Sequence, residues 1–492
     1  MDLATTLKLI LPELVLCVVG LLLLLLDLIW PDESKKGWLP YVGLLGLALA
    51  LIAVVSIAGQ QASLLSGMLA VDSFALFFKF IAVLSVGLVI LISIDFMKNR
   101  TPYRGEFFGF LVLAGLGMSL AAGASDLLMV YLAMELVSFT SYLLVGFLRE
   151  DAKSNEASLK YFFYGATASA VMLYGMSLLY GITGTTQLAG IADYFAAGAA
   201  EPTRLWLVVP ALLMLLAGFG FKIALVPFHQ WSPDAYEGAP TPVTAFLSVG
   251  PKAIGFALLM RVFITALPQF TTTWTAVLAA ISMATMSLAN LVALKQTNIK
   301  RMLAYSSIAQ AGYILIGFVS LSLNSESSFS GVNGVLIYLF AYLFTNLGAF
   351  VVAVAFEHAT GSVQIADYAG LIRRSPVLAV VMLICLLSLA GIPATGGFIG
   401  KLFVFGAAIQ VQFYALAVVG IVNSVIAVFY YFNVIRYMFF TPPAEGQEGT
   451  VPVPGLFGFV LTLTAALTIL IGIYPQPFIE LATQSVRLIS PV

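Results

Sequence analysis

The sequence predicts an all-α, polytopic membrane protein with about fourteen transmembrane helices. Composition is the first reason: 61% of the 492 residues are hydrophobic and only 9% are charged, whereas roughly a quarter of the residues in a soluble domain are charged. The mean hydropathy of +1.04 agrees with this class. The other two reasons are apolar runs long enough to cross a bilayer and a one-sided distribution of the basic residues between them.

Apolar runs of roughly 20 residues, the length that a helix needs to cross the hydrocarbon core, recur along the whole chain. The first run, from Leu14 to Leu26, continues into Asp27-Leu28-Ile29-Trp30 without a small-residue cleavage site. We therefore expect a retained helix rather than a signal peptide. The predicted spans are 9–30, 40–60, 71–94, 106–124, 127–148, 157–183, 205–228, 241–266, 273–294, 300–323, 332–356, 377–410, 413–440 and 453–475.

Basic residues between these spans collect on one side of the membrane, which is the cytoplasmic side in most membrane proteins. Fourteen follow odd-numbered spans: Lys35, Lys36, Lys98, Arg100, Arg104, Arg149, Lys153, Lys160, Lys295, Lys300, Arg301, Arg373, Arg374 and Arg436. Four lie on the other side: Lys8, Arg204, Arg261 and Arg487. This asymmetry predicts an even number of spans with both termini outside the cytoplasm.

Two segments of the chain resemble two later segments at nearly equal offsets. ELVSFTSYLLVGF at 135–147 aligns with SSIAQAGYILIGF at 306–318, and the Gly-Phe-x-x-Lys core at 218–222 aligns with 397–401. We expect two copies of a five-helix unit, 106–266 and 267–440, which cover the fourth to eighth and ninth to thirteenth spans. A three-helix segment, 1–105, precedes them, and a C-terminal helix and tail, 441–492, follows. Because five is odd, tandem copies have opposite orientations, as in many ion-coupled transporters.

Lys222 is the first of three lysines in the interior of predicted spans. A charge at that depth costs at least about 2.5–3.5 kcal/mol on insertion scales, so it usually faces a partner or water. Pro227 removes a backbone donor and clashes with the carbonyl of Ile223, which predicts a break or kink one turn beyond Lys222. Burial favours a neutral lysine and a nearby carboxylate favours a charged one, so a lysine held between these influences can exchange protons.

The other intramembrane charges are Glu135, Lys252 and Lys401. Glu135 lies in mid-span between apolar neighbours, and we expect it to pair with Lys222. Lys252 follows Gly250-Pro251 about ten residues into its span. Lys401 belongs to a run of 33 residues, 377–409, interrupted by glycines and Pro393. Two half-helices joined by an unwound segment, a common device for intramembrane ion sites, fit this run better than one straight span.

Each of these residues also has a purely structural explanation. A single buried lysine can pair with a carboxylate or extend to the interface, but three of them with Glu135, two at repeat-related positions, favour a function. Lys79, seven residues from Asp72, is expected to extend to the interface in this way. Lys160 is either a cytoplasmic anchor or the start of a proton path. His229 is either a relay, if helical geometry continues past the break, or a hydrogen-bonded residue at a helix end.

Several soluble-protein chemistries are excluded by the sequence. Gly400-Lys401 lacks the spacing of a phosphate-binding loop, and Gly218-Phe219-Gly220 lacks the third glycine of a dinucleotide fingerprint. Two cysteines and two separated histidines do not make a metal or iron–sulfur ligand set. The net charge of −1 does not suggest nucleic acid as a partner. We expect no cofactor in this chain.

The segment PFHQWSPDAYEGAPTPVTAFLSVGPKA, 227–253, resembles the signature of the antiporter-like membrane subunits of respiratory complex I. The likeness extends through NIKRMLAYSSIAQAGYILIG, IADYAGLIRRSP and LAGIPATGGFIGKLFVF, and so covers most of the fourth to thirteenth spans. Multisubunit cation/proton antiporters and membrane-bound hydrogenases share this core and are the alternative. Lys401 favours the N-type subunits, because a glutamate usually stands there in the M-type. No long lateral helix follows residue 475, which argues against the L-type.

The resemblance implies roles for six residues. The family has a glutamate in the fifth span, lysines in the seventh, eighth and twelfth spans, and two relay positions. In this sequence they correspond to Glu135, Lys222, Lys252, Lys401, His229 and Lys160. Redox chemistry in partner subunits, which hold quinone, FMN and iron–sulfur clusters, would drive protons through these residues to the outside. The implied neighbours are an M-type subunit and small subunits such as K. The implied location is a bacterial inner membrane.

Overall fold

The computed structural model describes residues 2–30, 36–198, 206–321, 329–443, 445–446 and 448–486. Lys35, Arg204 and Arg487, used above to predict sidedness, lie outside these ranges. The helices of the N-terminal half are α1 (Leu3–Leu9), α2 (Leu11–Ile29), α3 (Leu39–Ser56), α4 (Ser73–Met97), α5 (Arg104–Gly123), α6 (Leu127–Val145), α7 (Ala152–Thr183), α8 (Leu188–Ala196), α10 (Val208–Ile223), α11 (Trp231–Gly238) and α12 (Thr241–Ala266).

The helices of the second half are α13 (Thr271–Ala293), α14 (Ile299–Val319), α15 (Gly331–Thr360), α16 (Leu371–Arg374), α17 (Pro376–Ala390), α18 (Gly396–Gln410), α19 (Tyr414–Phe440), α20 (Gly455–Ile473) and α21 (Gln476–Val486). Short 3₁₀ turns are η2 (Leu65–Gly67), η3 (Pro268–Phe270) and η4 (Ile365–Tyr368). A small hairpin pairs β1 (Ala62–Leu64) with β2 (Leu69–Val71) in antiparallel register.

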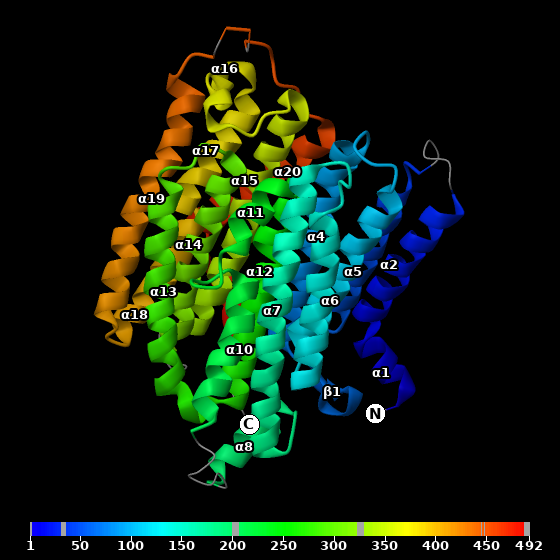
Figure 1. The fold of residues 1–492 in the computed structure, drawn as a ribbon, viewed down its shortest axis with the longest axis vertical. Coiled ribbons are helices and arrows are strands. Elements are labelled where there is room, and N and C mark those ends of the chain that lie inside the picture. Colours follow the sequence, from blue (N-terminus) through cyan, green and yellow to red (C-terminus); the bar gives the residue numbers. More distant parts are fainter. Residues whose placement is uncertain are drawn as a thin grey trace.

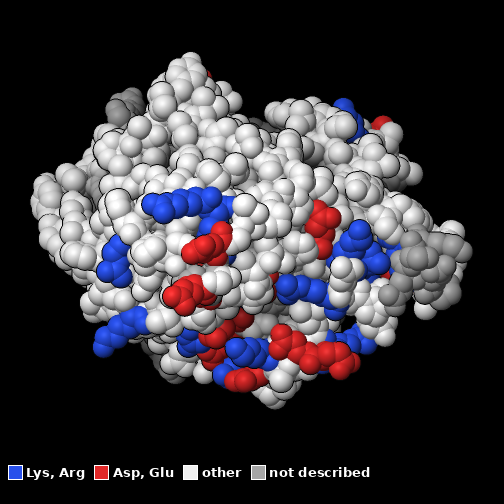
Figure 2. Space-filling model, turned by 90° about the horizontal axis from the view of Figure 1, so that it is seen from above, with Lys and Arg blue, Asp and Glu red and all other residues white. Residues whose placement is uncertain are grey.

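The described helices confirm the predicted all-helical membrane fold. Twelve of them are long and apolar enough to cross a bilayer, and α10, α17 and α18 are shorter apolar helices. Every predicted span coincides with one of these helices, except that 377–410 contains both α17 and α18. The long helices run roughly side by side as a bundle (Figure 1). The end of the bundle where α16 lies carries lysine, arginine and carboxylate side chains on an otherwise uncharged surface (Figure 2).

α12 and α15 form the centre of the bundle. Their most apolar windows are fully buried, whereas only a third of that of α2 is. A helix that is apolar on all sides is stable when other helices surround it, and a helix with exposed leucines on one side is stable against lipid. Lys252 lies on α12, so the bundle places this lysine where bulk water does not reach it directly.

Both breaks predicted from proline and glycine are present, but the first begins earlier than predicted. α10 ends at Ile223, and Ala224 adopts a left-handed conformation with φ 59°. The break therefore starts two residues after Lys222 rather than a full turn beyond it, because Pro227 disfavours helical geometry both at the residue before it and four residues earlier. In the second break, α17 ends at Ala390, Gly391 has φ 87° and α18 begins at Gly396.

The expectation that Lys79 extends to the membrane interface was wrong. Its side chain is completely buried, and Nζ lies 2.7 Å from Glu13 Oε1. Ser119 Oγ donates a hydrogen bond of 2.6 Å to the same oxygen. The sequence did not indicate Glu13 as a buried charge, because it stands in the first turn of α2, where a carboxylate usually faces the headgroups. The pair joins α2, α4 and α5 and is an intramembrane charge pair with a structural explanation.

We expect Lys79→Ala to destabilise the protein by about 3–5 kcal/mol, because it leaves the Glu13 carboxylate buried without its counterion. Replacing both residues with apolar side chains, Glu13→Leu with Lys79→Met, should restore most of that stability. Thermal denaturation of the purified protein in detergent measures both effects. A double variant no more stable than Lys79→Ala would show that the ion pair is not the source of the loss.

Candidate functional site

Lys222 and Glu135 are neighbours without a direct ion pair in the described part of the chain. Lys222 Nζ donates to Ser138 Oγ at 3.0 Å, and Ser138 lies one turn beyond Glu135 on α6. Ser169 of α7 donates to the Glu135 carboxylate. The predicted pairing is therefore indirect. The Ser138 hydroxyl donates its own proton to the Met134 carbonyl at 2.8 Å and accepts from Lys222, and the described residues show no hydrogen bond between it and Glu135.

Aromatic side chains pack around the break after α10. Trp231 Nε1 donates to the carbonyl of Phe221 at 2.9 Å, and Tyr161 of α7 stacks on Trp231 with ring centroids 4.2 Å apart. His229 lies between α10 and α11, nearly buried, and its Nδ1 has no hydrogen-bond partner in the described residues. Helical geometry does not continue past Ile223, so the condition for a shared face with Lys222 fails. Any link between them needs water.

Lys252 is fully buried on α12 and is held by α14. Its Nζ donates to the carbonyl oxygen of Ser307 at 2.7 Å and also to the Ser307 hydroxyl. Pro251 lies inside α12 without ending it. The ammonium thus rests on neutral oxygen atoms from the facing helix, which stabilise the charge without a counterion.

Lys401 occupies the second turn of α18, beside the break between α17 and α18. Nζ donates to the carbonyls of Leu389 and Ala390, each at 3.0 Å. These carbonyls are free because α17 ends at Ala390 and the residues that would have bonded them are not helical. The Tyr313 ring lies 4.6 Å from Nζ and adds a cation–π contact. The broken helix therefore supplies the oxygen cradle that its sequence predicts.

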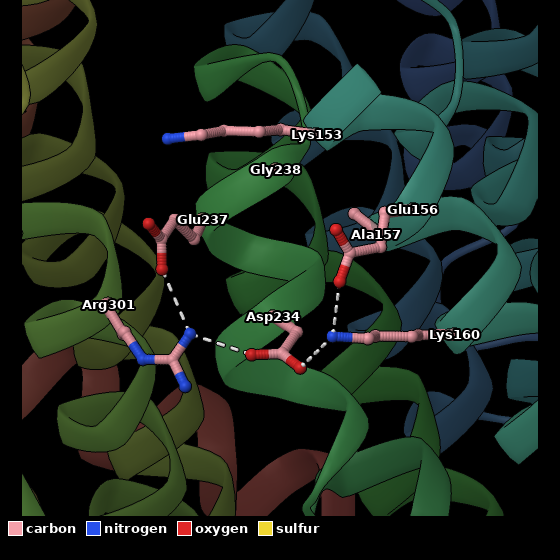
Figure 3. A pocket seen from close by; sticks show the side chains of 8 residues that line it. All are labelled: Lys153, Glu156, Ala157, Lys160, Asp234, Glu237, Gly238 and Arg301. Carbon is pink, nitrogen blue, oxygen red and sulfur yellow. Dashed lines mark hydrogen bonds and ion pairs between the residues drawn. The ribbon is translucent and has the colours of Figure 1, made fainter. Parts of the chain in front are cut away.

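Lys160 lies apart from the other three lysines, in a charged cluster at the start of α7 (Figure 3). Nζ lies 2.7 Å from Glu156 and 2.9 Å from Asp234 of α11, and Arg301 of α14 lies 2.7 Å from Asp234 and 2.9 Å from Glu237. These side chains line an open cavity of about 170 Å³. Burial raises the pKa of the Asp234 carboxyl, but hydrogen bonds from Lys160 and Arg301 outweigh burial and hold the pKa below its usual range.

The polar partners of the buried lysines were not singled out by the sequence. Serine is small and common in membrane helices, so the sequence alone does not indicate Ser138, Ser169 or Ser307 as partners. Gln310 is a clearer signal, because a buried amide in an apolar helix needs partners. In the repeat alignment, Ser138 and Gln310 belong to the aligned segments, which is the feature that could have pointed to them. The described residues hold no group of three or more potential metal ligands.

Comparisons with known proteins identify the family of the chain. Residues 124–427 match the family described as NADH:quinone oxidoreductase/Mrp antiporter, transmembrane region. NADH-quinone oxidoreductase subunit N of Trichlorobacter lovleyi is 43% identical over 98% of this chain and 97% of the relative.

A chain of respiratory complex I from Thermus thermophilus superposes with a TM-score of 0.80 at 31% identity, over 96% of this chain and 99% of that one. A chain of the Mrp complex of a Dietzia species shares the fold, with a TM-score of 0.86 at 21% identity over 99% and 98%.

The fold and the matches define an antiporter-like, proton-translocating membrane subunit. The chain belongs to the NADH-quinone oxidoreductase subunit N family and is a multi-pass membrane component of complex I.

Proposed function

We propose that Lys222, Lys252 and Lys401 carry protons through this subunit. The observation that supports this is the nature of their partners: each ammonium is held by hydroxyl or carbonyl oxygens, and none is in ion-pair contact with a carboxylate of the described residues. Such a lysine can release its proton without leaving an uncompensated buried carboxylate. Lys79, with Glu13 at 2.7 Å, cannot. Contact with a carboxylate therefore distinguishes Lys79, whose role is structural, from the three lysines proposed to carry protons.

The proton path starts, in this proposal, at the charged cavity that contains Lys160. Three carboxylates, Glu156, Asp234 and Glu237, and three cations, Lys153, Lys160 and Arg301, line it and make a polar entrance from the cytoplasm. Trp231 lies on α11, as Asp234 does, and contacts Phe221, the residue before Lys222. α11 therefore connects the cavity with the end of α10 that carries the lysine. His229, with its free Nδ1, relays the proton through water at the break.

Glu135, in this proposal, sets the proton affinity of Lys222 through its negative charge. When the carboxylate moves away, the ammonium loses a favourable charge and releases its proton, and when it returns the lysine is recharged. The released proton passes to Lys252, then to Lys401 and outward. Redox chemistry in partner subunits, with quinone, FMN and iron–sulfur clusters, supplies the driving force.

We place the subunit between an M-type antiporter-like subunit and small subunits such as K, in a bacterial inner membrane with both termini outside the cytoplasm. The charged end of the bundle in Figure 2 supports the assignment of that end to the cytoplasm. The paired breaks at Lys222 and Lys401 support the division into an N-terminal segment, 1–105, two inverted repeats, 106–266 and 267–440, and a C-terminal part, 441–492.

The test is proton pumping by the assembled complex. Lys222→Ala and Lys401→Ala should each lower the rate of NADH-driven proton uptake into inverted vesicles by roughly tenfold or more, a modest value for the loss of one proton-transfer residue. Lys295→Ala, which removes an exposed lysine between α13 and α14, should pump normally. If both buried-lysine variants assemble and keep normal turnover and normal protons per electron, the proposed relay is wrong.

A further inference from the structure

Lys401 differs from Lys222 in having no carboxylate beside it among the described residues. The repeat alignment places Ser306 of α14 at the position of Glu135 of α6. The second repeat therefore has a hydroxyl where the first has the group that sets proton affinity. The contacts of Ser306 therefore show which titratable group lies at the corresponding place in the second repeat.

Tyr431 of α19 is the group that Ser306 contacts. The two hydroxyl oxygens lie 2.5 Å apart, and either can be the donor. The Tyr431 side chain is completely buried in the protein. A phenol is both a donor and an acceptor, so it can pass a proton on and recover one.

Gln310 connects Tyr431 to Lys401. Its Nε2 donates to the Tyr431 hydroxyl at 3.3 Å and to the Leu389 carbonyl at 3.0 Å. The same carbonyl accepts a hydrogen bond from Lys401 Nζ. Tyr338 donates to Gln310 Oε1 and fixes the orientation of the amide. The Gln310 amide thus hydrogen-bonds both the phenol and a carbonyl of the lysine cradle.

The other end of this network meets Lys252. Ser306 is adjacent on α14 to Ser307, which accepts both hydrogen bonds from Lys252 Nζ. α14 therefore carries a polar stripe of three residues: Ser307 contacts Lys252, and Ser306 and Gln310 contact Tyr431. Every residue of this stripe is nearly or completely buried.

We propose that the Tyr431 hydroxyl is the proton-carrying group between Lys252 and Lys401, and that Gln310 is the residue that positions it. This rests on the proposed function of the two lysines. The Lys252 ammonium gives a proton, through water and the serine hydroxyls, to the Tyr431 oxygen, while the original hydroxyl proton leaves through water to the Lys401 amine. Lys252 ends neutral, Lys401 ends as an ammonium, and Tyr431 is unchanged.

The first experiment is Tyr431→Phe in the assembled complex, which removes one oxygen atom and keeps the ring. We expect the rate of NADH-driven proton pumping to fall at least fivefold, and Gln310→Leu to cause a smaller loss. The matched control is Tyr437→Phe, a partly buried tyrosine on the same helix whose hydroxyl has no part in the network. If Tyr431→Phe pumps like Tyr437→Phe while Lys401→Ala does not pump, this inference fails and the proposed function stands. If Lys401→Ala also pumps normally, the proposed function fails.

A second readout separates proton transfer from packing. Difluorotyrosine at position 431 preserves the hydroxyl and nearly preserves its volume, but its phenol is more acidic. If the hydroxyl exchanges the transported proton, the alkaline limb of the pH profile of pumping moves to lower pH. A profile that coincides with that of the unmodified protein would show that the hydroxyl only holds Ser306 and Gln310 in place, and would overturn the proposal.

Discussion

Lys252→Met should stop proton translocation by this subunit while leaving its fold intact. Methionine has nearly the length of lysine and no charge, so it fills the same space on α12 and removes only the proton-carrying group. Its partner, Ser307, keeps an acceptable environment because the carbonyl that loses Nζ belongs to a helix. We expect the pumping rate to fall by about tenfold or more, since one proton-transfer group contributes at least that much.

The control for this prediction is Lys98→Met, which removes an exposed lysine just after α4. Proton uptake into inverted vesicles, measured with turnover and with the yield of assembled complex, separates a failure to pump from a failure to assemble. A Lys252→Met complex that assembles, turns over and pumps like Lys98→Met would mean that the central lysine is structural. A Lys252→Met variant more thermostable than the unmodified protein would agree with this prediction, because a buried charge without a counterion has been removed.

The spans and the breaks could be predicted because they depend on local properties of the chain. Length of apolar runs, proline and glycine act on a few neighbouring residues, so α10, α17 and α18 end near the places that these residues indicate. The early end of α10 at Ile223 shows the limit of that reasoning. A proline disfavours helix in the preceding turn without always ending it, as Pro251 in α12 shows, and the exact residue that becomes left-handed depends on packing.

The contacts of the buried charges could be predicted only in part, because they join residues far apart in the chain. Lys79 and Glu13 are separated by two helix connections, and neither local sequence identifies the other. Lys222 donates to Ser138, one turn beyond Glu135 on α6, rather than to the carboxylate itself, and no pattern in either helix encodes this choice of partner. Repeat alignment goes further, since it relates α6 to α14 and directs attention to the polar stripe near Lys401.

Gly391→Ala should impair the function of Lys401 although the lysine itself is not substituted. Gly391 has φ 87°, which costs an alanine about 1–2 kcal/mol. Its added Cβ would also lie 2.8 Å from Cδ of Lys401 and 3.3 Å from Nζ. The flexible lysine side chain is the part that moves, so Nζ leaves the carbonyls of Leu389 and Ala390. We expect proton pumping to fall severalfold, together with a loss of thermal stability.

Gly361→Ala isolates the effect on the lysine from the effect on the backbone. Gly361 ends α15 with φ 72°, so an alanine there carries the same conformational strain, yet its added Cβ meets no atom within 4 Å. Both variants should lose about 1–2 kcal/mol of stability, and only Gly391→Ala should lose pumping. Equal pumping by the two variants would mean that displacing the Lys401 ammonium from its carbonyl cradle has no consequence. The cradle would then not explain the break between α17 and α18.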